Sequence, residues 1–185
     1  MSSQDARREV VDASFTIEIG EGFAGEGFNA AHINTVLGLR NGPVGTAFAT
    51  ALAQPTPGHV PFLAVWAPNV PVEPPTLFVN KATIAGDEHG NLTWGAAQAG
   101  VAAGVTAHVA DRFHAASLAQ LVLIVAVWVN PSAHDANLVF TNNRAATTTA
   151  LARAAKDWSA ATSVETAVSA MGSGVLPNNP YFTPR

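Results

Sequence analysis

The sequence contains no cysteine, and only 12% of its 185 residues are Asp, Glu, Lys or Arg. The missing cysteine excludes disulfide bonds, thiolate metal ligands and a cysteine nucleophile. Typical soluble proteins have about 25% charged residues, so we expect other subunits to cover part of this surface. The net charge of -4 and the absence of a basic run give no complement to a phosphate backbone, so no nucleic-acid partner is expected.

Long apolar runs are also missing. The longest, residues 121–129, has nine residues, whereas a membrane helix needs about 20, so we expect a buried strand and no membrane contact. The first residues are polar and charged and have no apolar segment typical of a signal peptide. We interpret residues 1–13 as a flexible leader.

Common cofactor and metal motifs are incomplete. Gly20, Gly22 and Gly25 match the spacing of a dinucleotide-binding loop, but a strand-like segment follows where that loop requires a helix. No phosphate-binding GxxxxGK[ST] motif occurs. The six histidines are scattered and form no recognisable zinc pattern, so no metal site is predicted.

The pattern of apolar residues predicts an α+β fold. Alternation begins at Phe15, and the glycine-rich segment 20–27 is expected to turn. The expected strands are 15–19, 30–37, 60–66, 76–84 and 122–129, and the expected helices are 43–53, 94–112 and 133–158. Because several strands precede the first long helix, we expect two layers, a mixed sheet with helices packed on one face. The single domain would span residues 14–170, followed by a Pro-rich C-terminal tail, residues 171–185.

Two expected strands each carry a pair of polar side chains on one face. His32 and Asn34 lie within the apolar segment 30–37, and Lys81 and Thr83 lie within 76–84. A buried imidazole or ammonium needs hydrogen-bond partners or a ligand. Taken alone, His32 is more readily interpreted as a structural histidine and Lys81 as an edge lysine.

A series of short motifs, in order along the chain, resembles the formaldehyde-activating enzymes of methylotrophic bacteria and methanogens. The motifs are Gly20-Glu21-Gly22, Gly25-Glu26-Gly27, Ala31-His32-Ile33, Ala67-Pro68-Asn69-Val70-Pro71, Pro75-Thr76-Leu77, Asn80-Lys81-Ala82-Thr83 and Gly95-Ala96-Ala97-Gln98. The resemblance covers about residues 20–158 and weakens after Val129.

The resemblance implies a cytoplasmic homopentamer with a ribosomal protein S5 domain 2-like fold and pterin sites at subunit contacts. It implies condensation of formaldehyde with tetrahydromethanopterin, a co-substrate, to methylene-tetrahydromethanopterin and water, with no covalently bound cofactor. The family's proton donor matches His32. Its pterin-contacting positions match Asn34, Leu63, Lys81, Thr83 and Gln98.

The sequence departs from the family at Asn34, where the family usually has an aspartate. An amide offers one neutral acceptor in place of a carboxylate, and a charge-assisted hydrogen bond is worth about 1.5–3 kcal/mol. Two alternatives therefore stay open. One is a divergent paralogue that binds a pterin, a folate or formaldehyde as a carrier or sensor, and the other is a purely structural oligomer.

The chemistry expected of His32 is general acid catalysis. Formaldehyde adds to amines without a catalyst, and the slow step is loss of hydroxide from the carbinolamine. A histidine near pKa 6.5 can protonate that leaving group. A Schiff base between Lys81 and formaldehyde is disfavoured, because a strand context offers no evident means of lowering the pKa of the lysine.

Overall fold

The computed structural model describes residues 8–156, 160–177 and 183. The chain falls into two compact units, Met1–Ala155 and Lys156–Arg185. In the described residues of the second unit, helix α6 (Ala160–Gly172) extends into the expected tail. Residues 1–7 of the expected leader and residues 178–182, 184 and 185 of the tail lie outside the described residues, and the predicted domain limits stay a prediction.

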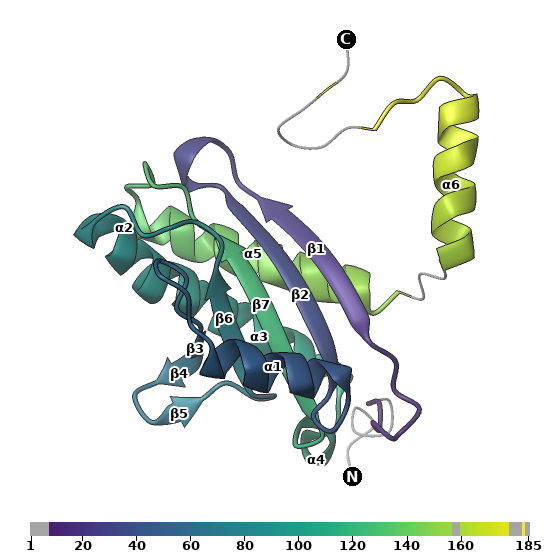
Figure 1. Ribbon diagram of the computed structural model, residues 1–185, viewed down its shortest axis with the longest axis horizontal. Coiled ribbons are helices and arrows are strands. Elements are labelled where there is room, and N and C mark those ends of the chain that lie inside the picture. The colour runs from purple at the N-terminus through teal and green to yellow at the C-terminus, as the bar shows by residue number, and fades with distance from the viewer. Residues whose placement is uncertain (1–7, 157–159, 178–182, 184–185) are drawn as a thin grey trace. The chain divides into compact units, whose positions relative to one another are not determined.

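A five-stranded mixed sheet forms the centre of the first unit (Figure 1). Its strands, in order across the sheet, are β1 (Glu18–Ala24), β2 (Ala31–Leu39), β7 (Leu121–Trp128), β6 (Thr76–Asn80) and β3 (Phe62–Leu63). β6 and β7 are parallel, and the other pairs are antiparallel. A separate hairpin joins β4 (Val65–Ala67) to β5 (Val70–Pro71). The predicted α+β class with a mixed sheet is confirmed.

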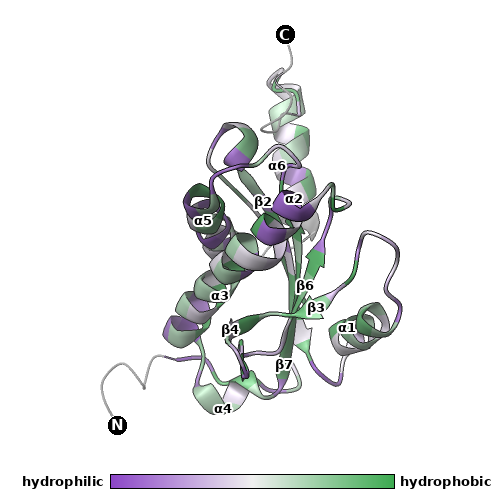
Figure 2. Ribbon diagram, turned by 90° about the vertical axis from the view of Figure 1, so that its left-hand side faces the viewer, coloured by the Kyte–Doolittle hydropathy of each residue, from purple (hydrophilic) through white to green (hydrophobic). Residues whose placement is uncertain are grey.

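Helices lie on both faces of this sheet. The helical segments are α1 (Pro43–Ala53), η2 (Gly27–Asn29), α2 (Asp87–Asn91), η3 (Leu92–Ala97), α3 (Gln98–Arg112), α4 (Ala115–Leu118) and α5 (Ala136–Ala154). Figure 2 shows α3 and α5 on one side of the sheet and α1 on the other. A Cβ at Gly38 of β2 would meet Val44 of α1, which confirms the close approach of that helix. The expectation that the helices pack on one face is therefore wrong for α1, which packs on the second face.

The glycine-rich segment is a strand, and the expectation that residues 20–27 turn is wrong for its first half. Gly20 and Gly22 lie in β1, where a Cβ would collide with the carbonyl oxygens of Ala150 and Ala146 in α5. These glycines permit close packing of strand on helix. The turn begins later, at Gly25 and Gly27, both with positive φ.

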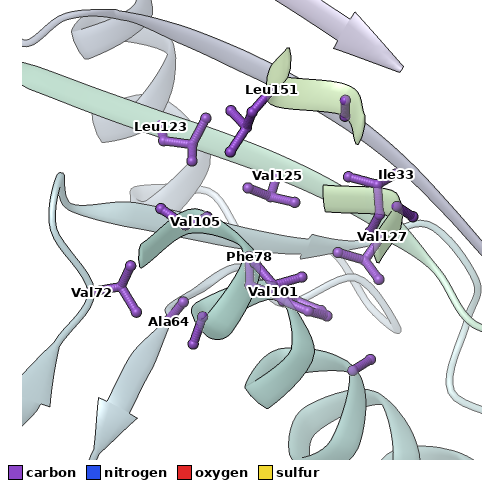
Figure 3. Close-up of a cluster of buried hydrophobic side chains, with 14 of the residues drawn as sticks. Ile33, Ala64, Val72, Phe78, Val101, Val105, Leu123, Val125, Val127 and Leu151 are labelled. Carbon is purple, nitrogen blue, oxygen red and sulfur yellow. The ribbon is translucent and has the colours of Figure 1, made fainter. Parts of the chain in front are cut away.

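The main core lies between the sheet and the pair α3 and α5 (Figure 3). Phe78 of β6 is fully buried and stacks on Phe62 of β3, with ring centroids 4.9 Å apart. The sheet and the two helices also contribute Ile33, Leu123, Val125, Val127, Val101, Val105 and Leu151. On β2 the buried residues alternate with half-buried ones, so His32 and Asn34 point to the opposite face, the one that α1 covers only in part.

Residues 8–13 differ from the expected flexible leader, because they are attached to the domain. Val11 is buried, and its N–H donates to Ser117 Oγ at 3.1 Å. The backbone N–H of Glu9 donates to the carbonyl of Arg112 at 2.7 Å, and the Glu9 carboxylate accepts from Arg112 Nε at 2.9 Å. Val10 and Val11 form an apolar pair between charged residues, which is too short a pattern to be recognised in the sequence.

Candidate functional site

His32 lies in the middle of three hydrogen-bonded strands. In the antiparallel register it is opposite Phe23 of β1 and Trp128 of β7, and Asn34 is opposite Glu21 and Ala126. Residues directly opposite in such a pair share a face. The strands therefore place an imidazole, a carboxylate, an amide and two aromatic rings on one face.

Four polar side chains on this face form a continuous network, which we call the His32 network: Glu21, His32, Lys81 and Asn34. Glu21 Oε1 lies 2.9 Å from His32 Nε2, and Lys81 Nζ lies 3.4 Å from His32 Nδ1. Lys81 Nζ also donates to Asn34 Oδ1 at 2.7 Å. Both nitrogens of the imidazole are thus directed at protein groups, which fixes its orientation.

The ring of Phe23 holds the imidazole from a third direction. Its centroid lies 4.0 Å from that of His32, with an interplanar angle of 13°. The His32 side chain keeps 21% of its surface exposed and that of Glu21 keeps 53%, so solvent and ligands can reach the network. Stacking and hydrogen bonding together restrict the imidazole to one rotamer.

Lys81 follows β6 directly, because the strand ends at Asn80 and does not continue to Ile84 as expected. The Asn80 amide donates to the carbonyls of Gly58 and Ala82, which bends the chain away from the sheet. The N–H of Lys81 still donates to Val127 of β7 at 2.7 Å. Burial lowers the pKa of Lys81 below its ordinary value, and the charge of Glu21 partly offsets that effect.

Thr83 lies near the His32 network in sequence but bonds elsewhere. It is exposed, and its hydroxyl lies 3.2 Å from His59 Nε2. His59 Nδ1 donates to the carbonyl of Asn80 at 2.8 Å, so Nε2 is the acceptor and the Thr83 hydroxyl donates to it. Because β6 ends at Asn80, the expectation that Lys81 and Thr83 share one face of a strand is wrong.

Leu63 and Gln98 occupy the β3 edge of the domain. Leu63 is 45% exposed and is opposite Leu77 in the sheet. Gln98 begins α3, is buried, and donates to the carbonyl of Val65 at 2.6 Å. Neither side chain joins the His32 network, so within one chain the six expected site residues divide into three groups: the network, Thr83, and this edge.

Glu21 and Phe23 were missed as site residues by the sequence analysis. Their alternation with Gly20 and Gly22 was the available signal, but the glycines suggested a turn. Only the register of β1 on β2 brings Glu21 and Phe23 to His32, and that register depends on the close packing of β1 against α5.

Comparison with known proteins identifies the family of this chain. The family model "Formaldehyde-activating enzyme (Fae)" matches residues 19–171, most of the chain and all of the His32 network. The chain belongs to the formaldehyde-activating enzyme family. The resemblance inferred from the sequence motifs is thereby confirmed.

Curated relatives of this family member are archaeal proteins named "Bifunctional enzyme Fae/Hps". The chain is 39% identical over 138 residues to the protein of Methanosphaera stadtmanae, covering 74% of this chain and 34% of the relative. It is 40% identical over 137 residues to that of Methanococcoides burtonii, covering 74% and 35%. It is 41% identical over 138 residues to that of Methanocella arvoryzae, with the same shares. The chain thus spans about a third of the length of these relatives.

Two further observations concern cations and membranes. The described residues contain no group of three or more His, Asp or Glu side chains placed to hold a metal ion. Among the helices in the described part of the chain, none combines the length and the apolar character that a bilayer span requires.

Proposed function

We propose that this family member condenses formaldehyde with tetrahydromethanopterin to methylene-tetrahydromethanopterin and water, with His32 as the general acid. The observation that carries the proposal is the position of His32, which Glu21, Lys81 and Phe23 hold on an accessible strand face. The chain's membership of the formaldehyde-activating enzyme family supports the same function. The reaction class would be that of a carbon–oxygen hydro-lyase.

The chemical steps need no redox change. A pterin nitrogen adds to the carbonyl carbon and gives a carbinolamine. His32 then donates a proton to the hydroxyl, the C–O bond breaks, and water departs with its electron pair to give an iminium ion. The second pterin nitrogen attacks the iminium carbon, and the proton that this nitrogen loses returns to His32. An acid in good geometry contributes about 100- to 10,000-fold, and a held pterin closes the ring as an intramolecular reaction.

The other expected site residues would bind the pterin. Asn34 and Lys81 border His32, Leu63 would pack against the ring system, and Thr83 and Gln98 would hydrogen-bond its edge. Because the amide nitrogen of Gln98 donates to Val65 within the chain, Gln98 Oε1 is the atom that would accept from a ligand N–H. Gln98 and Leu63 lie apart from the His32 network within one chain. We therefore further propose a homopentamer in which neighbouring copies complete each site, and we propose that it is cytoplasmic.

One observation favours a second function. The amide oxygen of Asn34 is a neutral acceptor for Lys81. Formaldehyde-activating enzymes usually have an aspartate at this position. A divergent family member that binds a pterin, a folate or formaldehyde with little turnover, as a carrier or sensor, would tolerate that change.

Pterin binding and turnover, measured on the same preparation, separate these functions. We expect tetrahydromethanopterin to bind, by calorimetry, and the initial rate of methylene-tetrahydromethanopterin formation to exceed the rate without protein. Binding without a rate increase would support the carrier. Absence of both would leave a structural oligomer and refute the proposal.

Glu21 would act as a positioning residue for His32. We expect Glu21→Ala to lower kcat about three- to tenfold with little change in KM, because one partly exposed hydrogen bond contributes about 0.5–1.5 kcal/mol. Glu21→Gln keeps an acceptor for Nε2–H and should recover most of the rate. Steady-state kinetics of both variants test this, and equal impairment of kcat in the two would show that position is not what Glu21 supplies.

A further inference from the structure

The ammonium group of Lys81 has two close acceptors, and neither is a carboxylate. They are Asn34 Oδ1 at 2.7 Å and His32 Nδ1 at 3.4 Å. The nearest acidic side chain in the His32 network, Glu21, bonds to His32 Nε2 instead. Among the described residues no carboxylate forms an ion pair with Lys81. Burial lowers the pKa of Lys81, and the charge of Glu21 only partly offsets that effect.

A proton transferred between Lys81 Nζ and His32 Nδ1, which lie 3.4 Å apart, would link two reactive states. When that proton is on Nζ, Lys81 is an ammonium ion and the neutral imidazole accepts from it. When it is on Nδ1, Lys81 is a free amine and His32 is an acid, because Nε2–H still donates to Glu21. A neutral amine keeps two hydrogens, so its bond to Asn34 Oδ1 survives while its lone pair faces Nδ1. One proton position therefore creates the nucleophile and the acid together.

We propose that Lys81 captures formaldehyde covalently, with His32 Nδ1 as the acid. This inference rests on the proposed function, which supplies formaldehyde as the ligand. It names a residue that forms a bond to the substrate, beyond the acid role of His32.

The capture balances as follows. The Nζ lone pair attacks the formaldehyde carbon, the C=O π electrons move to oxygen, and a proton passes from nitrogen to oxygen to give a hydroxymethyl group on Nζ. His32 Nδ1–H then protonates the hydroxyl, the C–O bond breaks and water leaves with its electron pair. The nitrogen lone pair forms a double bond to the methylene carbon, and water or an amine reverses the resulting protonated iminium. His32 regains its proton from solvent.

Geometry explains why the acid is Nδ1. The carbinolamine hydroxyl is two bonds from Nζ, and Nζ lies 3.4 Å from Nδ1, so the leaving oxygen stays within reach of that nitrogen. Nε2 is held by Glu21. Asn34 is the feature of this chain that favours capture, because an aspartate at that position would raise the pKa of Lys81 and stabilise its ammonium form.

Reductive trapping tests the inference with a control inside the chain. The sequence has two lysines, Lys81 and the exposed Lys156. The full-length protein is treated with limiting formaldehyde and cyanoborohydride at about pH 7, without pterin, and methylation of each lysine is followed by peptide mass spectrometry. We expect Lys81 to be labelled at least about tenfold faster than Lys156, because it has a positioned acid. Equal or slower labelling of Lys81 would overturn the inference.

The pH dependence has a defined sign. Burial lowers the pKa of Lys81, and the charge of Glu21 acts in the opposite direction. His32 is the other titratable group that faces Lys81. The labelling ratio should be largest near neutral pH and fall as the pH approaches about 10.4, the ordinary pKa of a lysine side chain. A ratio that rises with pH would contradict a lowered pKa and the inference with it.

Asn34→Asp is the matched variant. It adds a carboxylate at the position of the amide, so we expect labelling of Lys81 to slow about tenfold or more while that of Lys156 stays constant. Unchanged labelling of Lys81 in a variant with the wild-type circular dichroism spectrum would overturn the role of Asn34. The labelling experiment contains no pterin, so the two proposals can fail separately. Labelling of Lys81 in a protein that shows no turnover would refute only the proposed condensation. Turnover by a protein that is not labelled at Lys81 would refute only this capture.

Discussion

Replacing His32 with alanine is expected to lower the rate of methylene-tetrahydromethanopterin formation above background by about 100- to 10,000-fold, the contribution of a general acid in good geometry. In the proposed reaction, the imidazole supplies the proton that the leaving hydroxyl needs. It is held by Glu21, Lys81 and the ring of Phe23, so alanine removes the acid and the centre of the His32 network. The measurement is the initial rate at saturating pterin and formaldehyde.

A second histidine provides the control for this variant. His134 is exposed, and its ring bonds to the carbonyl of Ser132, two residues away. We expect His134→Ala to keep the wild-type rate. A His32→Ala protein that retains most of the rate acceleration would show that another group supplies the proton.

Replacing Phe78 with alanine is expected to lower the free energy of unfolding by about 3–5 kcal/mol, the usual cost of a buried Phe→Ala change. Phe78 has 0% exposed surface and belongs to the core cluster that also contains Val101 and Val105 of α3 (Figure 3). Its ring stacks on that of Phe62. Its strand, β6, ends next to Lys81, so loosening it would also affect the His32 network. Urea denaturation measures the loss.

Phe28 provides the comparison for Phe78. It is 56% exposed in η2, so Phe28→Ala should change the free energy of unfolding by no more than about 0.5 kcal/mol. If the two variants lost similar stability, the core would not be centred on Phe78.

The sequence predicted the central strands and α1 because their signals are local. Continuous apolar residues mark β7, alternation marks β2, and Pro43 marks the first turn of α1. β1 was misplaced because its glycines permit close contact with α5, which lies more than 100 residues away in sequence. The end of β6 was misplaced because the amide of Asn80, through its bonds to Gly58 and Ala82, redirects the chain.

The candidate site was predictable only as separate residues. The motifs identified His32, Asn34 and Lys81, and the structure brings these three together. Glu21 and Phe23 could not be assigned without the register of β1 on β2. The lowered pKa of Lys81 could not be foreseen either, because it depends on burial after strand packing and on the distance to Glu21. Thr83 was expected beside Lys81 and instead bonds to His59.

The central claim is that this chain is a working formaldehyde-activating enzyme, and one rate measurement tests it most directly. Formaldehyde and tetrahydromethanopterin are mixed at fixed concentrations with increasing amounts of the wild-type protein, and the initial rate of methylene-tetrahydromethanopterin formation is recorded. The account predicts a rate that rises in proportion to protein concentration above the spontaneous reaction. A rate that stays at the spontaneous value at every protein concentration would contradict it.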